Sequence, residues 1–137
     1  AAASLSGVLS AALGRLVPYL SERVAFGAPI ASFQAIQHRM VDLFLLEVRS
    51  EVTVDAAARA LAAGSADSCR LAAVAHVFVA ASVPDAIDEC IQLTGGIGFT
   101  WEYPLHHELR RSVALAAACG GAAESRRRLF LDGAARG

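Results

Sequence analysis

The sequence predicts an all-α protein, an up-and-down antiparallel four-helix bundle with one extra helix at its C-terminal end. Ala and Leu are abundant, and no segment alternates apolar and polar residues with the period of two that a strand requires. Long apolar-periodic segments are joined by short connections that contain Gly or Pro, which is typical of helical bundles. The 137 residues are 55% apolar and 18% charged, which suits one domain with one core and argues against intrinsic disorder.

The first helix is predicted over about residues 4–23, where Leu5, Leu9 and Leu16 fall on one face. Pro18 lies inside this segment and is expected to kink the helix or to start a new one. Residues 26–30 read F-G-A-P-I, which predicts a turn-rich connection.

The second helix is predicted over about residues 32–63, with Ser32 as its N-cap. Residues 43–48 are apolar nearly all round the helix, which predicts burial on more than one side. Gly64 and Ser65 end this segment, and Ser65 or Asp67 can cap the next helix. We therefore expect the second and third helices to pack antiparallel.

The third helix is predicted over about residues 66–93, with a kink expected at Pro84 and a stop at residues 95–98, G-G-I-G. A fourth helix is expected over about residues 104–118. Gly120 and Gly121 interrupt the pattern, and the extra helix follows over about residues 122–134.

Charge and cysteine content exclude several classes of protein. The 12 basic residues, all of them Arg, and the 13 acidic residues give a net charge of -1, which argues against nucleic-acid binding. Since no charge-free apolar run reaches about 18 residues, we expect no transmembrane helix and no membrane partner. Cys69, Cys90 and Cys119 form no C-x-x-C and no zinc spacing, which fits free thiols and a cytoplasmic location.

The histidines do not form a recognisable metal site. A di-iron bundle needs Glu-x-x-His on two helices, and this motif does not occur in the sequence. His38 and His76 are isolated and are interpreted as solvated or hydrogen-bonded structural residues. His106 and His107 are adjacent, so we expect them to point in different directions and not to chelate together.

Three short segments carry more information than helix periodicity. Arg23 stands beside a tight turn, where a guanidinium can grip a phosphate. Gln34 lies just inside a predicted helix start, and Gly95 and Gly96 follow a helix and expose backbone that a ligand can approach. Taken singly, these residues can equally be surface polar groups and turn glycines.

Taken together, the segments resemble the C-terminal helical domain of the acyl-CoA dehydrogenase family. The resemblance rests on R-x-x-F-G-x-P-I-x-x-F-Q from Arg23, Q-x-x-G-G-x-G-F from Gln92, and E-Y-P from Glu102 followed by Arg110. It covers about residues 7–129 and implies that residues 1–137 form this one domain. The family's N-terminal helical domain and middle β-domain are expected to lie outside this chain.

The resemblance implies an FAD-dependent oxidoreductase that desaturates the Cα–Cβ bond of an acyl-CoA thioester, in fatty acid or steroid metabolism. It further implies a homo-oligomer, or a heteromer with a related subunit, in which this domain holds the FAD of a neighbouring subunit. Arg23 would meet the pyrophosphate, Phe26 and Gln34 would lie along the cofactor, and three residues would line its adenosine end: Gln92, Gly95 and Gly96. Without the other domains, this chain alone is expected to be inactive and not to hold FAD.

The sequence departs from the family pattern at the catalytic base. Cys119 stands where many members have the Glu base, and Gly121 stands at a following Thr. A thiol in an apolar helix is expected to stay protonated, and Glu124 lies on a different face, so no catalytic residue is assigned. Either the base lies upstream of Ala1, or the protein is a non-catalytic subunit that pairs with a catalytic one.

The segment G-F-T-W-E over residues 98–102 resembles actinobacterial heteromeric members that act on steroid or sterol side chains. A third alternative is a helical oligomerisation module without activity of its own.

Overall fold

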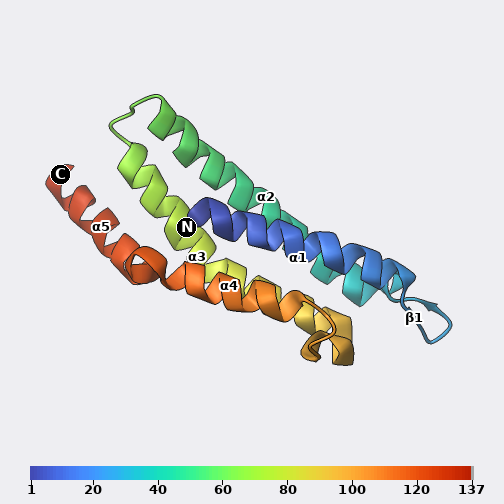
Figure 1. Cartoon of the computed structure of the whole chain (residues 1–137). Helices are drawn as coiled ribbons and strands as arrows, with labels where there is room; N and C mark the ends of the chain where they lie inside the picture. Colours follow the sequence, from blue (N-terminus) through green and yellow to red (C-terminus); the bar gives the residue numbers. More distant parts are fainter. Residues whose placement is uncertain (137) are drawn as a thin grey trace.

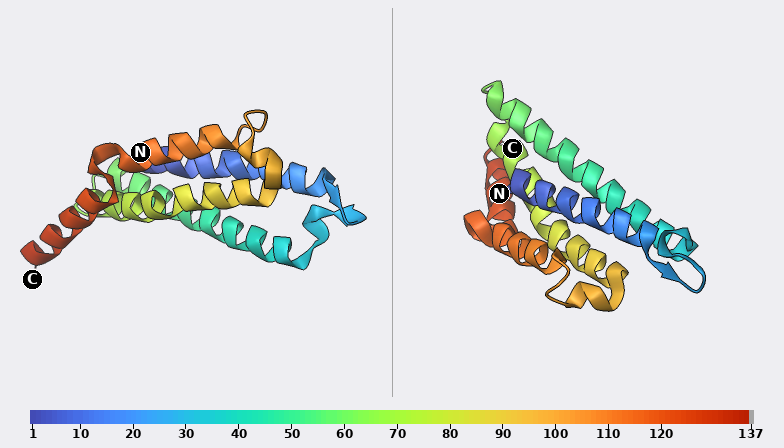
Figure 2. Two further views of the ribbon diagram at one scale, coloured as in Figure 1. Left: turned by 90° about the horizontal axis from the view of Figure 1, so that it is seen from below. Right: turned by 45° about the vertical axis from the view of Figure 1, so that its right-hand side comes forward.

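The computed structural model describes residues 1–136 and is an all-α bundle (Figure 1). Its helices are α1 (Ala2–Glu22), α2 (Gln34–Ala62), α3 (Ser68–Thr94), α4 (Leu105–Ala117) and α5 (Gly121–Arg136). The first four alternate in direction, and α5 continues beyond the bundle at the C-terminal end (Figure 2). The predicted fold class is therefore confirmed, as is the antiparallel packing of α2 against α3.

The core lies mainly between α1 and α3, and α3 contacts every other α-helix. The fully buried side chains on these two helices include Leu5, Leu9, Leu16, Val79, Val83 and Ile87. Their helical spacing explains why these segments fold as amphipathic helices around one apolar stripe. Burial of each of these side chains contributes about 1.5–3 kcal/mol.

Both internal prolines are accommodated without ending a helix. The helix α1 continues through Pro18, and α3 continues through Pro84. The expectation that Pro18 starts a new helix is therefore wrong. Pro18 lies on the exposed side of α1, where water can satisfy the backbone carbonyl that its ring leaves unpaired.

The connection between α1 and α2 is a small hairpin. Strand β1 (Val24–Ala25) pairs antiparallel with β2 (Ala28–Pro29), and a 3₁₀ turn, η1 (Ile30–Ser32), leads into α2. Ser32 is not the N-cap. Its hydroxyl donates to the Pro29 carbonyl oxygen at 2.6 Å inside the 3₁₀ turn, and Phe33 occupies the cap position instead.

The helix α2 buries one side only. Leu43, Ser50 and Ala57 face the bundle and are buried. In contrast, Phe44 and Val48 are 43% and 54% exposed. The prediction that residues 43–48 are buried on more than one side is therefore wrong within a single chain, because no other described helix covers the outer face of α2.

Two segments are long and apolar enough to cross a membrane by length and composition, Ala2–Glu22 and Ser68–Phe99. Core helices of a bundle meet the same criterion, and 44% and 39% of their most apolar windows are buried inside the fold. The expectation of no transmembrane helix stays a prediction.

Candidate functional site

The two motif groups of the sequence meet at one end of the bundle. The helices α1 and α3 run in the same direction, so the hairpin after α1 and the glycine turn after α3 lie at the same end (Figures 1 and 2). The Tyr19 hydroxyl joins them by donating to the Thr94 carbonyl oxygen at 3.0 Å. Tyr19 is a residue that the sequence patterns do not single out, and its only signal is its place one helical turn before Arg23.

The hairpin presents three of the predicted residues to solvent. Arg23 is exposed at the end of α1, and its carbonyl accepts a hydrogen bond from the Ile30 amide at 2.8 Å. Phe26 is 99% exposed, with a left-handed φ of 53°, and its ring lies 6.4 Å from the Phe33 ring, edge to face. Gln34 is the exposed first residue of α2, as the sequence predicts. A cation, an aromatic ring and an amide are therefore exposed on the hairpin and at the start of α2.

A Cβ atom could be added without a clash at two glycines of the turn, but not at a third. Gly95 ends α3 with φ 68°, and a Cβ added at Gly95 or Gly96 would meet no atom within 4 Å. A Cβ on buried Gly98 would overlap the Thr94 side chain and lie 2.6 Å from the Ile91 carbonyl oxygen. The turn is therefore fixed by close packing at Gly98 and leaves accessible backbone at the other two glycines. Gln92 is exposed one turn earlier on α3.

The loop after the glycine turn carries an exposed indole. Trp101 is 76% exposed, its ring lies 4.7 Å from that of His106, and the Arg110 guanidinium carbon is 5.7 Å from its ring centroid.

The rings of His106 and His107 are only 3.9 Å apart, so the expectation that they point in different directions is wrong. No group of three potential metal ligands occurs in the described part of the chain.

The break between α4 and α5 occurs at the predicted glycines. Cys119, Gly120 and Gly121 have φ values of 57°, 86° and 71°, which no continuous helix can accommodate. Cys119 is exposed in this break, so the expectation of a thiol in an apolar helix is wrong. Left-handed backbone at three successive residues turns the chain out of the helix.

Glu124, the carboxylate nearest to Cys119 in sequence, is held by arginines. Its oxygens accept hydrogen bonds from Arg127 at 2.8 and 3.0 Å and from Arg128 at 2.9 Å. These hydrogen bonds lower the pKa of Glu124 to about 2. A carboxylate with this pKa is a weak proton acceptor, and the structure therefore gives no reason to assign Glu124 as a base.

A buried polar pair fixes α5 on α3. The His76 Nδ1 and the Ser125 Oγ lie 2.8 Å apart, both residues are buried, and the His76 Nε2 has no hydrogen-bond partner. The interpretation of His76 as a hydrogen-bonded structural residue is confirmed. His38 is exposed, as expected for a solvated side chain.

The buried pair of His76 and Ser125 predicts that the protein is less stable at acidic pH. Burial lowers the pKa of His76 below its ordinary value of 6.5, so below that pH the unfolded chain binds a proton that the folded chain resists. The free energy of unfolding should therefore fall as the pH drops from about 7.5 to about 5.5, as measured by urea unfolding. The variant His76→Gln should show a smaller pH dependence, whereas His38→Gln should retain that of the wild type. An unchanged slope in His76→Gln would contradict the assignment.

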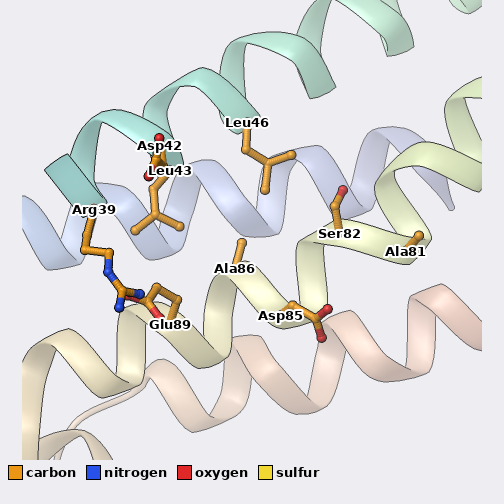
Figure 3. A pocket seen from close by; sticks show the side chains of 9 residues that line it. All are labelled: Arg39, Asp42, Leu43, Leu46, Ala81, Ser82, Asp85, Ala86 and Glu89. Carbon is orange, nitrogen blue, oxygen red and sulfur yellow. The ribbon is translucent and has the colours of Figure 1, made fainter.

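Two surface grooves lie away from the motif residues. The first, of about 390 Å³, lies between α2 and α3 (Figure 3). An ion pair between Arg39 and Glu89 spans it, with Leu43 and Leu46 among its apolar lining residues. The second, of about 400 Å³, lies between α1 and α4 and contains the pair of Arg15 with Glu108 at 3.1 Å. Neither is lined by the predicted cofactor residues.

Comparison with known proteins places this geometry in a family. Residues 1–134 match the family model described as acyl-CoA dehydrogenase, C-terminal domain. The chain is 36% identical to acyl-CoA dehydrogenase FadE34 of Mycobacterium tuberculosis, over 93% of this chain and 18% of that protein. It is also 36% identical to acyl-CoA dehydrogenase IpdE2 of Mycolicibacterium smegmatis, over 93% of this chain and 39% of that protein.

Solved structures of acyl-CoA dehydrogenases support the same family assignment. Butyryl-CoA dehydrogenase from Megasphaera elsdenii superposes with a TM-score of 0.89 at 26% identity, over 94% of this chain and 33% of that one. A structure described as the Tcur3481-Tcur3483 steroid ACAD G363A variant has a TM-score of 0.87 at 32% identity, over 98% and 38%. The chain spans less than two fifths of the length of these relatives. It belongs to the acyl-CoA dehydrogenase family and corresponds to its C-terminal domain.

Proposed function

We propose that this domain serves an FAD-dependent acyl-CoA dehydrogenase that desaturates an acyl-CoA thioester, and that it supplies flavin contacts and an oligomer interface. One observation carries the proposal. Two motif groups that are about 60 residues apart in sequence lie at one end of the bundle, joined by the hydrogen bond from Tyr19 to Thr94. FAD, when bound, supplies the hydride acceptor of this reaction.

The exposed residues at this end suit a dinucleotide. The Arg23 guanidinium takes part in none of the ion pairs among the described residues, so it is free to bind the pyrophosphate. Phe26 offers an apolar surface and Gln34 a hydrogen-bonding amide. Gly95 and Gly96 leave room for close approach of a ligand to the backbone, beside Gln92.

The catalytic base comes from outside this domain in our proposal. Cys119 replaces the usual carboxylate, and the arginines beside Glu124 keep it a weak base. A carboxylate on another part of the same protein, or on a related subunit, then removes the α-proton. The similarity to a structure described as a steroid ACAD, that is, a steroid acyl-CoA dehydrogenase, supports a steroid-derived acyl group and a heteromeric partner.

The proposal is tested by measuring flavin absorption and enzymatic turnover. The full-length assembly that contains this domain should show a flavin absorption band and should reduce an electron-accepting dye when given an acyl-CoA, whereas the 137-residue chain alone should do neither. Turnover with a steroid-derived acyl-CoA and none with butyryl-CoA would support the steroid substrate class. Activity that appears only after a related subunit is added would assign the base to that subunit. A full-length assembly that is folded but binds no FAD, with or without that subunit, would overturn the proposal.

The alternative is a non-catalytic subunit domain or an oligomerisation module. The exposed apolar face of α2 favours this alternative, because such a face suits association and needs no flavin. A stable oligomer without a flavin band and without dye reduction would support it.

A further inference from the structure

The loop between η2 (Gly95–Phe99) and α4 carries an aromatic side chain that the core of the bundle does not use. Trp101 is 76% exposed and is not part of the hydrophobic core. The loop, drawn in orange, protrudes from the side of the bundle beside α4 (Figure 2). A buried indole removes a large apolar area from water, so an indole that the fold leaves exposed is available for binding.

Neighbouring residues fix the position of this indole. The ring of His106 lies 4.7 Å from that of Trp101 at an interplanar angle of 78°, and its Nδ1 lies 2.9 Å from the Tyr103 carbonyl oxygen. The amide and the hydroxyl of Thr100 both donate to the Ile97 carbonyl oxygen, at 3.0 and 2.8 Å, so the residue before the indole is also held. An aromatic surface that is ordered before a ligand arrives loses little conformational entropy on binding.

A cation lies beside the same ring. The Arg110 guanidinium carbon is 5.7 Å from the indole centroid, and Arg110 is exposed. It takes part in none of the ion pairs among the described residues. An exposed aromatic ring with an adjacent guanidinium can bind a heterocyclic base and its phosphate together. The two side chains therefore indicate a ligand that is flat, aromatic and anionic.

We propose that Trp101 and Arg110 bind an adenine nucleotide, with the adenine stacked on the indole and a phosphate beside the guanidinium. Trp101 lies five residues after Gly96, and the backbone at Gly95 and Gly96 is accessible to a ligand. This inference rests on the proposed function, in which the glycine turn lines the adenosine end of FAD, and it adds the side chains that recognise the base. Acyl-CoA also contains an adenine nucleotide, and the experiments distinguish these two sources.

The first experiment compares FAD with FMN, which lacks the adenosine. In the apo form of the full-length assembly, Trp101→Ala should raise the dissociation constant for FAD about ten- to a hundredfold and leave that for FMN unchanged. Trp101→Phe keeps an aromatic ring and should recover most of the FAD affinity. Phe130→Ala is the matched control, since Phe130 on α5 is also 76% exposed, and this variant should bind FAD as the wild type does.

The second experiment compares an acyl-CoA with the corresponding acyl-pantetheine, which lacks the nucleotide. The KM of the Trp101→Ala assembly for each thioester is measured at saturating FAD. A loss confined to FAD, to acyl-CoA or to these two ligands supports the proposal and identifies which molecule supplies the adenine. Unchanged binding of both, or an equal loss for FMN or for the acyl-pantetheine, would overturn it.

The third experiment tests the guanidinium by titrating the apo assembly with ADP and with adenosine. The wild type should bind ADP more tightly than adenosine, and Arg110→Gln should lower ADP affinity about tenfold while leaving adenosine affinity unchanged. Arg111→Gln is the matched control, because Arg111 is the exposed neighbour of Arg110 in sequence. Equal ADP affinity of wild type and Arg110→Gln would remove Arg110 from the proposed site.

The same measurements separate this inference from the proposed function. If the folded assembly binds FAD and Trp101→Ala binds FAD and acyl-CoA as the wild type does, the nucleotide site fails and the proposed function stands. If the assembly binds no FAD but binds ADP, and Trp101→Ala weakens that binding, the nucleotide site stands and the flavin role fails. If Trp101→Ala instead dissociates the subunits and leaves nucleotide affinity unchanged, Trp101 is a protein contact and the inference is overturned.

Discussion

Replacing Arg23 by Ala is expected to raise the dissociation constant for FAD about ten- to a hundredfold. The FAD pyrophosphate carries about two negative charges, and a charge-assisted hydrogen bond to a guanidinium contributes roughly 1.5–3 kcal/mol. Arg23 is exposed and forms no ion pair with Glu22 or another acid among the described residues, so its charge is available to a ligand. Titration of the apo form of the full-length assembly with FAD measures the effect.

Gln34→Ala provides the comparison for Arg23. Its amide makes a neutral hydrogen bond, which contributes roughly 0.5–1.5 kcal/mol, so the loss of FAD affinity should be smaller. Arg15→Ala serves as a control, because Arg15 is paired with Glu108 in the groove between α1 and α4. Equal FAD affinity of wild type and Arg23→Ala would remove Arg23 from the site.

The second large effect is expected at Gly98. An added methyl group would overlap the Thr94 side chain and lie 2.6 Å from the Ile91 carbonyl oxygen. Thr94 cannot simply turn away, because its hydroxyl donates to that same carbonyl at 2.7 Å and its own carbonyl accepts from Tyr19. Gly98→Ala should therefore lower the free energy of unfolding by about 1–3 kcal/mol, as measured by urea unfolding.

Gly96→Ala is the matched control in the same turn. A Cβ at Gly96 would meet nothing within 4 Å, and this glycine does not have a positive φ. Its substitution should leave the stability unchanged while reducing FAD affinity through the blocked approach to the backbone. If both glycine variants unfold at the same urea concentration as the wild type, close packing at Gly98 does not stabilise the turn.

The helices were predictable because their signal is repeated many times. Each helix carries its apolar spacing over several turns, so a single proline such as Pro18 does not outweigh it. Single-residue signals were less reliable. Ser32 has the chemistry of an N-cap, yet its hydroxyl bonds to Pro29 because a 3₁₀ turn precedes α2.

The candidate site was predictable only in part. The position of Gln34 at the start of α2 and of Gly95 at the end of α3 followed from local sequence. The bond from Tyr19 that joins their two regions is a contact over 75 residues, which no local pattern encodes. Burial of α2 was overestimated because periodicity reports which faces are apolar and not which partner covers them. The conformation of Cys119 depends on the two glycines after it, which end the helix one residue earlier than expected.

Trp101 gives this domain a built-in optical reporter. It is the single tryptophan of the chain, and it projects into solvent directly after the glycine turn, whose last bond runs from the Thr100 amide to the Ile97 carbonyl oxygen at 3.0 Å. Indole emission overlaps flavin absorption, so a flavin held near this end should quench the fluorescence by energy transfer. Ligand occupancy can therefore be followed without attaching any label.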